Sequence, residues 1–366
     1  MSAPNPEMPT VPSPRANPDL VGHEPAEQTL LGAHRSGRLP HAWLLSGPRG
    51  IGKATLAYRF ARYVLAEGAG GEGLFATQGQ AESLALDPDH TVARRVAADG
   101  HRDLRTLERR PDPNNGRSRG QITVGEARAT GQFLHMTAAE GGWRVVIVDP
   151  IDELNRSAAN ALLKMLEEPP DKVLLLLISH APGRLLPTIR SRCCNLALGP
   201  LAPEIVDQLM ARYAPNLPVE ERVALARLGD GSIGRALDLA AGGGLDLYRE
   251  LLGLLESLPT LNAAAAHALG DRLGRGADVA AFRTVSELLI WWLARLIRGR
   301  AGAAPSPEVV PGEGALMARL MERHGLAYWL DLWEKTSRLL TSAEPANLDR
   351  KQVFITALLG LETVAS

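Results

Sequence analysis

The residues best suited to chemistry lie in one glycine-rich stretch near the N-terminus. Gly47, Gly52 and Lys53 stand at the spacing G-x-x-x-x-G-K, and Gly50 lies between them. In this pattern successive backbone N–H groups converge on an anion at a helix N-terminus, while the lysine reaches the outer phosphates. The stretch therefore predicts a phosphate-binding loop for ATP or ADP. A glycine turn without a ligand is the alternative that the spacing alone leaves open.

One position of this loop departs from the usual pattern. Ala54 stands where a Ser or Thr hydroxyl normally binds Mg²⁺. The next residue, Thr55, points about 100° further round the helix. Nucleotide binding remains the expectation, but the positioning of Mg²⁺ stays open.

A carboxylate follows a second apolar stretch. Residues 143–149 read as a buried strand that ends in Asp149, the type of residue that partners Mg²⁺ at a phosphate loop. A strand-end turn former is the simpler interpretation of this aspartate. The next residue is Pro150, which has no acid–base group that could orient water. Asp152 and Glu153 are predicted to be acids that lead into a helix.

The elements that position these groups follow from the apolar pattern. Near-continuous apolar strands at residues 42–46, 143–149 and 173–179 alternate with helices. This pattern predicts an α/β fold with a parallel sheet covered by helices on both faces, with ligands at the carboxyl ends of the strands. The loop, Asp149 and Ser179 would then share one edge. Asn155 is the predicted N-cap of a helix over residues 156–168.

Other parts of the chain carry no chemical motif. Residues 1–20 are rich in Pro, Ser and Asn and predict a disordered lead-in, and residues 67–100 predict a flexible insertion with order returning near Arg102. From residue 244 onward the pattern is purely helical. Leu288, Trp291, Trp292 and Leu296 form a stripe there that indicates the core of a helix bundle.

Composition limits the class of protein. The 366 residues include 45% hydrophobic and 22% charged residues, which is typical of a soluble globular protein with two or three domains. A net charge of -1 argues against a protein that coats nucleic acid or membrane by bulk charge. No apolar run is long enough to span a membrane, so the cytoplasm is the expected location. Cys193 and Cys194 are adjacent, which disfavours a disulfide or an all-cysteine zinc site.

Two further motifs carry a family resemblance. Residues 158–170 read Ala-Ala-Asn-Ala-Leu-Leu-Lys-Met-Leu-Glu-Glu-Pro-Pro, and residues 188–193 read Thr-Ile-Arg-Ser-Arg-Cys. With the phosphate loop they resemble bacterial DNA polymerase III clamp-loader subunits, which are AAA+ ATPases, over about residues 24–240. The resemblance implies an AAA+ module over residues 21–200, a small helical lid over 201–243 and an all-α collar over 244–366.

Within that family the chain looks like the delta-prime type. The proline after Asp149 and the Gly-Lys-Ala-Thr at residues 52–55 are similar to that type rather than to the gamma/tau motor type. The resemblance implies that Arg192 is an arginine finger acting in trans on the ATP of a neighbouring subunit. It also implies that Arg235, in the motif Gly-Ser-Ile-Gly-Arg-Ala at residues 231–236, and Ser179 face nucleotide held by this chain. Without the resemblance, Arg192 and Arg235 would be solvated arginines near helix ends.

The resemblance also implies partners. These are the delta and gamma/tau subunits in a hetero-pentamer, with the sliding clamp and primed DNA reached through the complex. The family's four-cysteine zinc module has no counterpart here, because no cysteine precedes Cys193, so no zinc is expected.

Three functions remain open on the sequence. The first is a stator subunit with little or no ATPase activity of its own, and the second is a competent gamma/tau-like ATPase. The third is a small-molecule phosphotransferase, which shares only the phosphate loop. Ala54 and Pro150 favour the first function over the second.

Overall fold

The computed structural model describes residues 11–68, 82–109, 122–140, 142–274, 279–302, 307–322 and 324–365. The described residues fall into two compact units. The first unit holds the residues up to Val206 together with Gly231–Gly234, and the second holds Asp207–Asp230 and the residues from Arg235 onward. The predicted division into module, lid and collar stays a prediction.

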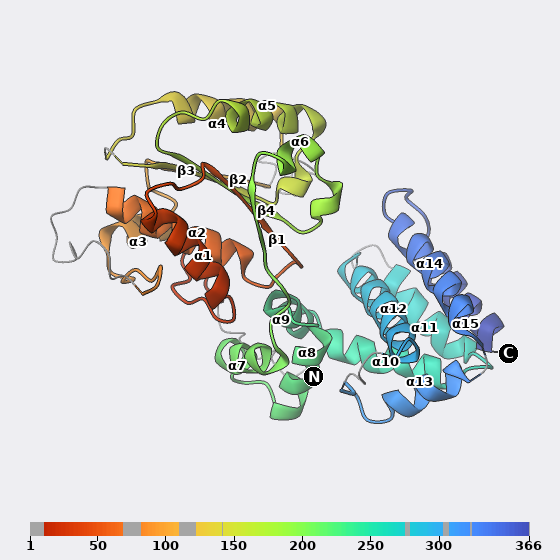
Figure 1. The fold of residues 1–366 in the computed structure, drawn as a ribbon. Helices are drawn as coiled ribbons and strands as arrows, with labels where there is room; N and C mark the ends of the chain where they lie inside the picture. The colour runs from red at the N-terminus through yellow and green to blue at the C-terminus, as the bar shows by residue number, and fades with distance from the viewer. Residues whose placement is uncertain are drawn as a thin grey trace. The chain divides into compact units, whose positions relative to one another are not determined.

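A parallel sheet forms the centre of the first unit (Figure 1). Its strand order is β2-β3-β4-β1-β5, and the strands are β1 Ala42–Ser46, β2 Leu104–Glu108, β3 Arg144–Asp149, β4 Val173–Ser179 and β5 Cys194–Ala197. Ser46 pairs with Ser179, and Glu108 pairs with Asp149. The carboxyl ends of these four strands therefore share one edge, as the sequence predicts.

Helices cover both faces of this sheet (Figure 1). Side chains alternate along each strand, so Leu45 and Leu176 join one apolar core while Leu44 and Leu175 join the other. The first core includes α1 Glu24–Arg35, α2 Lys53–Gly68 and α3 Thr91–Ala97, and the second includes α4 Val124–His135, α5 Arg156–Glu167 and α6 Pro187–Arg190. The predicted fold class is confirmed.

Local capping explains where α5 begins. The side-chain oxygen of Asn155 accepts a hydrogen bond from the backbone N–H of Ala158 at 2.8 Å. This bond satisfies one of the backbone donors that a helix leaves without an intrahelical partner. The predicted N-cap is confirmed, and the helix buries Leu162 and Leu166 against the sheet.

The second unit is helical, as the sequence predicts. The remaining helices are α7 Pro203–Tyr213, α8 Val219–Leu228, α9 Ile233–Ala241, α10 Gly244–Glu256, α11 Ala263–Gly274, α12 Val279–Arg300, α13 Glu313–Met321, α14 Leu326–Ser342 and α15 Arg350–Ala365, of which α7 and α9 begin in the first unit. The 3₁₀ turns η1 Ile151–Glu153 and η2 Pro182–Arg184 belong to the first unit. Leu288 and Trp292 are fully buried in α12. No helix in the described ranges is both long and apolar enough to cross a bilayer.

The expected insertion at residues 67–100 contains an ordered helix. His90 caps the start of α3 by accepting a hydrogen bond from the N–H of Val92 at 3.2 Å, and Val92 and Val96 are buried in the core. The expectation that order returns only near Arg102 is therefore wrong. Composition did not reveal this helix because it is stabilised by only a few buried residues, chiefly Val92 and Val96. Residues 69–81 lie outside the described residues.

The expected disordered lead-in is also wrong for residues 11–20, which we call the N-terminal strap. Arg62 of α2 donates to the carbonyl oxygens of Arg15 at 2.9 Å and Asn17 at 2.7 Å, and Arg59 donates to Pro18. Arg59 and Arg62 are both buried, and burial lowers the pKa of Arg62 to about 10. Buried cations need acceptors, so a strap with little apolar surface is held by its backbone carbonyls.

We predict that Arg62→Met loosens the strap. Methionine keeps an apolar stem but removes both donors, so two backbone carbonyls lose their partners at a cost of about 1–3 kcal/mol. Hydrogen exchange at the amides of Ala16 and Asn17, which bond to Ser13 in the wild type, should accelerate. Arg38→Met, at an exposed arginine before β1, is the matched control. Wild-type exchange in the Arg62 variant would contradict this account of the strap.

Candidate functional site

The loop between β1 and α2, residues 47–52, is named the phosphate loop here. Gly47, Gly50 and Gly52 have φ values of 147°, 75° and 107°, in the region that favours glycine. A Cβ atom on Gly47 would lie 2.2 Å from the carbonyl oxygen of Leu198. Both the backbone conformation and the close approach therefore require glycine at this position.

Every carbonyl oxygen from Ser46 to Ile51 accepts a hydrogen bond from outside the loop. The donors are the backbone N–H of Leu198 to Ser46 at 2.8 Å, Lys53 Nζ to Gly47 at 2.7 Å and to Pro48, Ser232 Oγ to Arg49 at 2.8 Å, the N–H of Gly234 to Gly50 at 2.9 Å, and His23 Nε2 to Ile51 at 2.7 Å. The loop is thus held from four separate segments of the chain.

The N–H groups of the same loop are left for a ligand. Those of Arg49, Gly50, Ile51 and Gly52 meet no acceptor among the residues that the structure describes. They precede the N-terminus of α2, where the helix dipole also favours negative charge. The loop's carbonyl groups are bonded to other protein groups, and its N–H groups have no described acceptor. This arrangement can bind phosphate oxygens.

Lys53 is buried at the centre of this site. It is 3% exposed, and burial lowers its pKa to about 8, although the charges of Asp149 and Asp152 act to raise it. Its ammonium group is bonded to the loop's own carbonyls. A bound phosphate would supply the negative charge that this buried cation otherwise finds only in the two aspartates.

Asp149 ends β3 close enough to Lys53 for the two charges to affect each other. Burial raises the pKa of Asp149 to about 6, and the charge of Glu108, its neighbour in the sheet, acts in the same direction. Lys53 and Arg49 oppose the increase. At neutral pH the carboxylate is charged and available to a cation.

Asp152 does more than the sequence predicts. Its carboxylate accepts a hydrogen bond from the hydroxyl of Ser179 at 2.8 Å and from the backbone N–H of His180. Asp152 does lie in the helical turn η1 that precedes α5, as expected, but its carboxylate also joins η1 to the end of β4. The buried Ser179 hydroxyl, expected near nucleotide, donates to this carboxylate.

Two histidines also belong to the site and were missed. His23 is buried and supports Ile51, and His180 follows Ser179. Burial and the charge of Lys53 lower the pKa of His180 to about 4, so it is neutral at physiological pH. Neither residue stands in a motif, and their partners are distant in sequence, so local patterns carried no signal for them.

Residue 54 is an alanine, so the usual metal-binding hydroxyl is missing at this position. The hydroxyl of Thr55 makes no hydrogen bond to any described residue. Within the described ranges, no group of three or more His, Cys, Asp or Glu side chains could hold a metal ion. The open N–H groups and Lys53 fit a phosphate chain, and Ala54 supplies no hydroxyl for an accompanying Mg²⁺, which is bound mainly through phosphate oxygens and one or two side chains.

Arg192 lies just after α6, apart from the phosphate loop. Its side chain is 35% exposed and forms an ion pair with Glu167 at 2.8 Å. It also donates to the carbonyl oxygen of Thr188 at 3.0 Å and to the hydroxyl of Ser191 at 3.4 Å. Its polar partners in the described part of the chain are in or beside α5 and α6, and none is in the phosphate loop.

Arg235 belongs to the second unit. Its guanidinium lies over the ring of Trp291, 5.8 Å from the centroid. The structure does not test its expected role at nucleotide, which stays a prediction.

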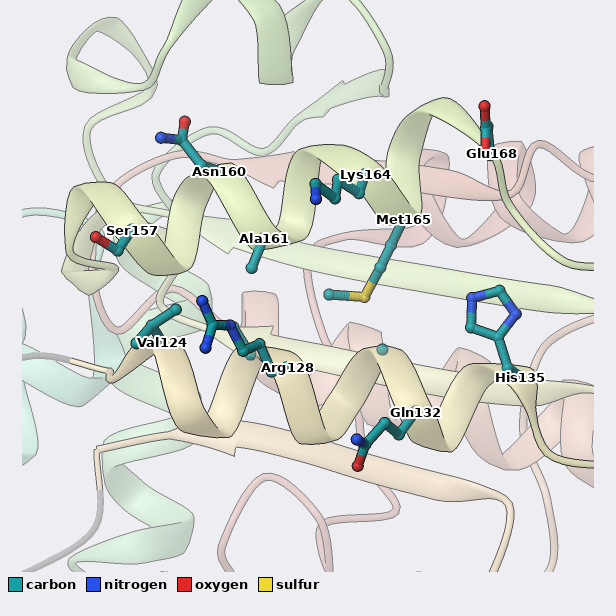
Figure 2. A pocket seen from close by; sticks show the side chains of 12 residues that line it. Val124, Arg128, Gln132, His135, Ser157, Asn160, Ala161, Lys164, Met165 and Glu168 are labelled. Atoms are coloured by element: carbon teal, nitrogen blue, oxygen red, sulfur yellow. The ribbon is translucent and has the colours of Figure 1, made fainter.

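A separate groove of about 710 Å³ lies between α4 and α5. Arg128 points from α4 toward α5, and Met165 points from α5 toward α4 (Figure 2). Arg128 and Lys164 are exposed on its walls and form no ion pair with described residues. None of the phosphate-loop residues lines this groove, so it is not the nucleotide site.

The fold and the loop define a phosphate-loop protein with a parallel sheet, and comparison with known proteins narrows the class. Residues 22–202 match the family model described as "DNA polymerase III, delta subunit". DNA polymerase III subunit delta' of Pseudomonas aeruginosa is 37% identical over 207 residues, covering 56% of this chain and 58% of that protein. The Escherichia coli K12 delta' subunit is 32% identical over 218 residues, covering 60% of each.

Over residues 22–202 the chain is therefore similar in sequence to the delta-prime subunits of DNA polymerase III. The match spans less than two thirds of the length of these relatives. The tau/gamma subunit of Haemophilus influenzae is also similar, 30% identical over 230 residues, covering 62% of this chain and 30% of that protein. A gamma subunit-related protein of Thermotoga maritima aligns with a TM-score of 0.39 at 18% identity, covering 93% of this chain and 99% of that one.

We predict that Asp149→Asn stabilises the protein in a pH-dependent way. The pKa of this acid is about 6 when folded against an ordinary 3.8, so its charged form is disfavoured by folding and stability falls as pH rises between these values. Asparagine removes that penalty. The Tm gain over wild type should be several degrees at pH 7.5 and smaller at pH 4.

Thermal melts at the two pH values test this prediction, with Asp171→Asn as the control at an exposed aspartate before β4. A loss of Tm at pH 7.5 in the Asp149 variant would show that Lys53 stabilises the carboxylate more than burial disfavours it.

Proposed function

We propose that the chain is a clamp-loader subunit of the DNA polymerase III holoenzyme. In this proposal it is a stator that supplies Arg192 in trans to the ATP of a neighbouring subunit. It would assemble with delta and gamma/tau subunits in a hetero-pentamer that loads the sliding clamp onto primed DNA. The family match supports a place among the DNA polymerase III subunits. The chemistry of the site supports a chain that binds nucleotide and supplies Arg192 while a neighbouring subunit hydrolyses ATP.

The position of Arg192 carries the proposal. The described polar partners of Arg192 lie in or beside α5 and α6 and none is in the phosphate loop, which supports a contact with a phosphate held by another chain. Its guanidinium is planar, always charged and half-exposed, which suits the oxygens of a γ-phosphate. Arginine fingers of this kind accelerate phosphoryl transfer by about 10³–10⁵ where measured in GTPases.

The phosphate loop supports nucleotide binding without turnover. The open N–H groups and Lys53 would hold the phosphates of ATP or ADP, and Asp149 would face any Mg²⁺ that accompanies them. Bound ATP would supply both the γ-phosphate and its leaving group, ADP. Ala54 provides no hydroxyl for the metal, and Pro150 provides no group to orient water. The proposal includes no zinc, because Cys193 and Cys194 are the only cysteines in the chain.

A competent gamma/tau-like ATPase is the second candidate. The intact Gly52-Lys53 pair and the open N–H groups favour it, as does the similarity to a tau/gamma subunit. It requires Mg²⁺ and water to be positioned by residues outside the usual places. The phosphotransferase interpretation does not explain the family match.

We predict that the isolated chain binds ATP with weak Mg²⁺ dependence and hydrolyses it at background rate. Lys53→Ala should weaken ATP binding by more than tenfold, because a charged hydrogen bond contributes about 1.5–3 kcal/mol. Lys164→Ala, at an exposed lysine of the same unit, is the matched control. Calorimetry and a phosphate-release assay provide the measurements.

Gel filtration with purified delta and gamma/tau subunits tests the assembly part of the same proposal. Robust hydrolysis by the pure chain that disappears in Lys53→Ala would favour the gamma/tau-like ATPase and reject the stator.

A further inference from the structure

Trp291 of α12 is covered by two cations in the second unit. The guanidinium of Arg295, one turn along the same helix, lies 4.7 Å from the ring centroid, and that of Arg235 from α9 lies 5.8 Å away. Tyr248 of α10 packs edge-on at 6.1 Å. The indole is 8% exposed, so these contacts are largely shielded from water, where cation–π attraction is strongest.

A buried carboxylate fixes the first of these cations. Glu313 is 2% exposed and accepts hydrogen bonds from Arg295 at 2.8 Å, from the N–H of Val309 at 2.8 Å and from the hydroxyl of Tyr248. Arg295 also donates to the carbonyl oxygen of Pro307 at 2.9 Å. Arg295 and Tyr248 are therefore locked in place, and the Trp291 ring that they contact forms a rigid platform.

Arg235, which lies in α9, contacts the same Trp291 ring. Burial lowers the pKa of Arg235, while Glu287 and Asp230 act to raise it, and an arginine side chain stays protonated in proteins. α9 and α12 are thus joined by a cation that lies on a fixed aromatic ring. Its position on the Trp291 ring gives Arg235 a role in packing α9 against α12, which the sequence does not indicate.

The motif that contains Arg235 is divided between the two units. Ser232 and Gly234 belong to the first unit and hold the carbonyl oxygens of Arg49 and Gly50. Arg235, the next residue along the chain, belongs to the second unit. The first part of the motif supports the phosphate loop, and the arginine contacts the helix bundle.

We propose that Arg235 is a clamp residue of the helical unit, which fastens α9 to α12 through Trp291, and that it is not a nucleotide contact. Its contribution is to the position of α9 rather than to phosphate binding. The proposal does not depend on the stator function, since it concerns contacts within the second unit.

A thermal double-mutant cycle tests the clamp. We expect Arg235→Ala and Trp291→Leu each to lower the Tm of the full chain by about 2–6 °C. The double variant should lose little more than the larger single loss, because both changes remove the same contact. Arg300→Ala, at an exposed arginine of α12, should leave the Tm unchanged. Additive losses in the double variant would overturn the proposal.

ATP binding provides a readout that separates a clamp from a nucleotide contact. We expect ATP affinity in Arg235→Ala to stay within about twofold of wild type, because a lost phosphate contact would cost about tenfold or more. Arg235→Lys should recover part of the Tm, since it keeps a cation over the ring. A tenfold loss of affinity in Arg235→Ala, without such a loss in Trp291→Leu, would identify a nucleotide contact and overturn the clamp. If wild type binds no ATP, Arg235 is not a nucleotide contact in this chain, and the thermal cycle decides whether it fastens α9 to α12.

Discussion

The closed hydrogen bonding of the phosphate-loop carbonyls is the constraint on which the rest of the site depends. Because the carbonyls of residues 46–51 all accept bonds from protein groups, the loop's N–H groups remain open to an anion. The donors come from the start of α1, from the segment after β5, from the start of α9 and from Lys53. The loop can therefore keep its shape only while these distant segments stay together, which links nucleotide binding to the whole first unit.

In the proposed function, this chain binds nucleotide without hydrolysing it. The groups that hold phosphate are present in one place, whereas the usual hydroxyl and the group that would orient water are replaced by Ala54 and Pro150. Arg192, the residue best suited to stabilise charge in phosphoryl transfer, is 35% exposed and paired with Glu167 elsewhere in the first unit. In the proposed function, the nucleotide that Arg192 contacts would be held by a neighbouring subunit and not by this chain's own phosphate loop.

Local patterns predicted the sheet, the phosphate loop and the Asn155 cap because each depends on residues close together in sequence. The ordered strap was missed because its acceptors are backbone carbonyls, and their donors, Arg59 and Arg62, lie about forty residues further along the chain. His23 and the further bonds of Asp152 were missed for the same reason, since each residue bonds to a distant segment. The surroundings of Arg235 depend on Trp291, and a helical pattern does not show which ring an arginine will contact.

The most direct test of the central claim is the clamp-stimulated ATPase rate of reconstituted complexes that carry this chain as wild type, Arg192→Ala or Arg192→Lys, with assembly checked by gel filtration. Removing a half-exposed arginine should change stability by no more than about 0.5 kcal/mol, so all three complexes should assemble. The account predicts that the alanine complex hydrolyses ATP and loads clamps much more slowly, and that lysine restores little because a point charge lacks the planar fork. Wild-type turnover in the assembled alanine complex would contradict it and reduce Arg192 to a surface charge.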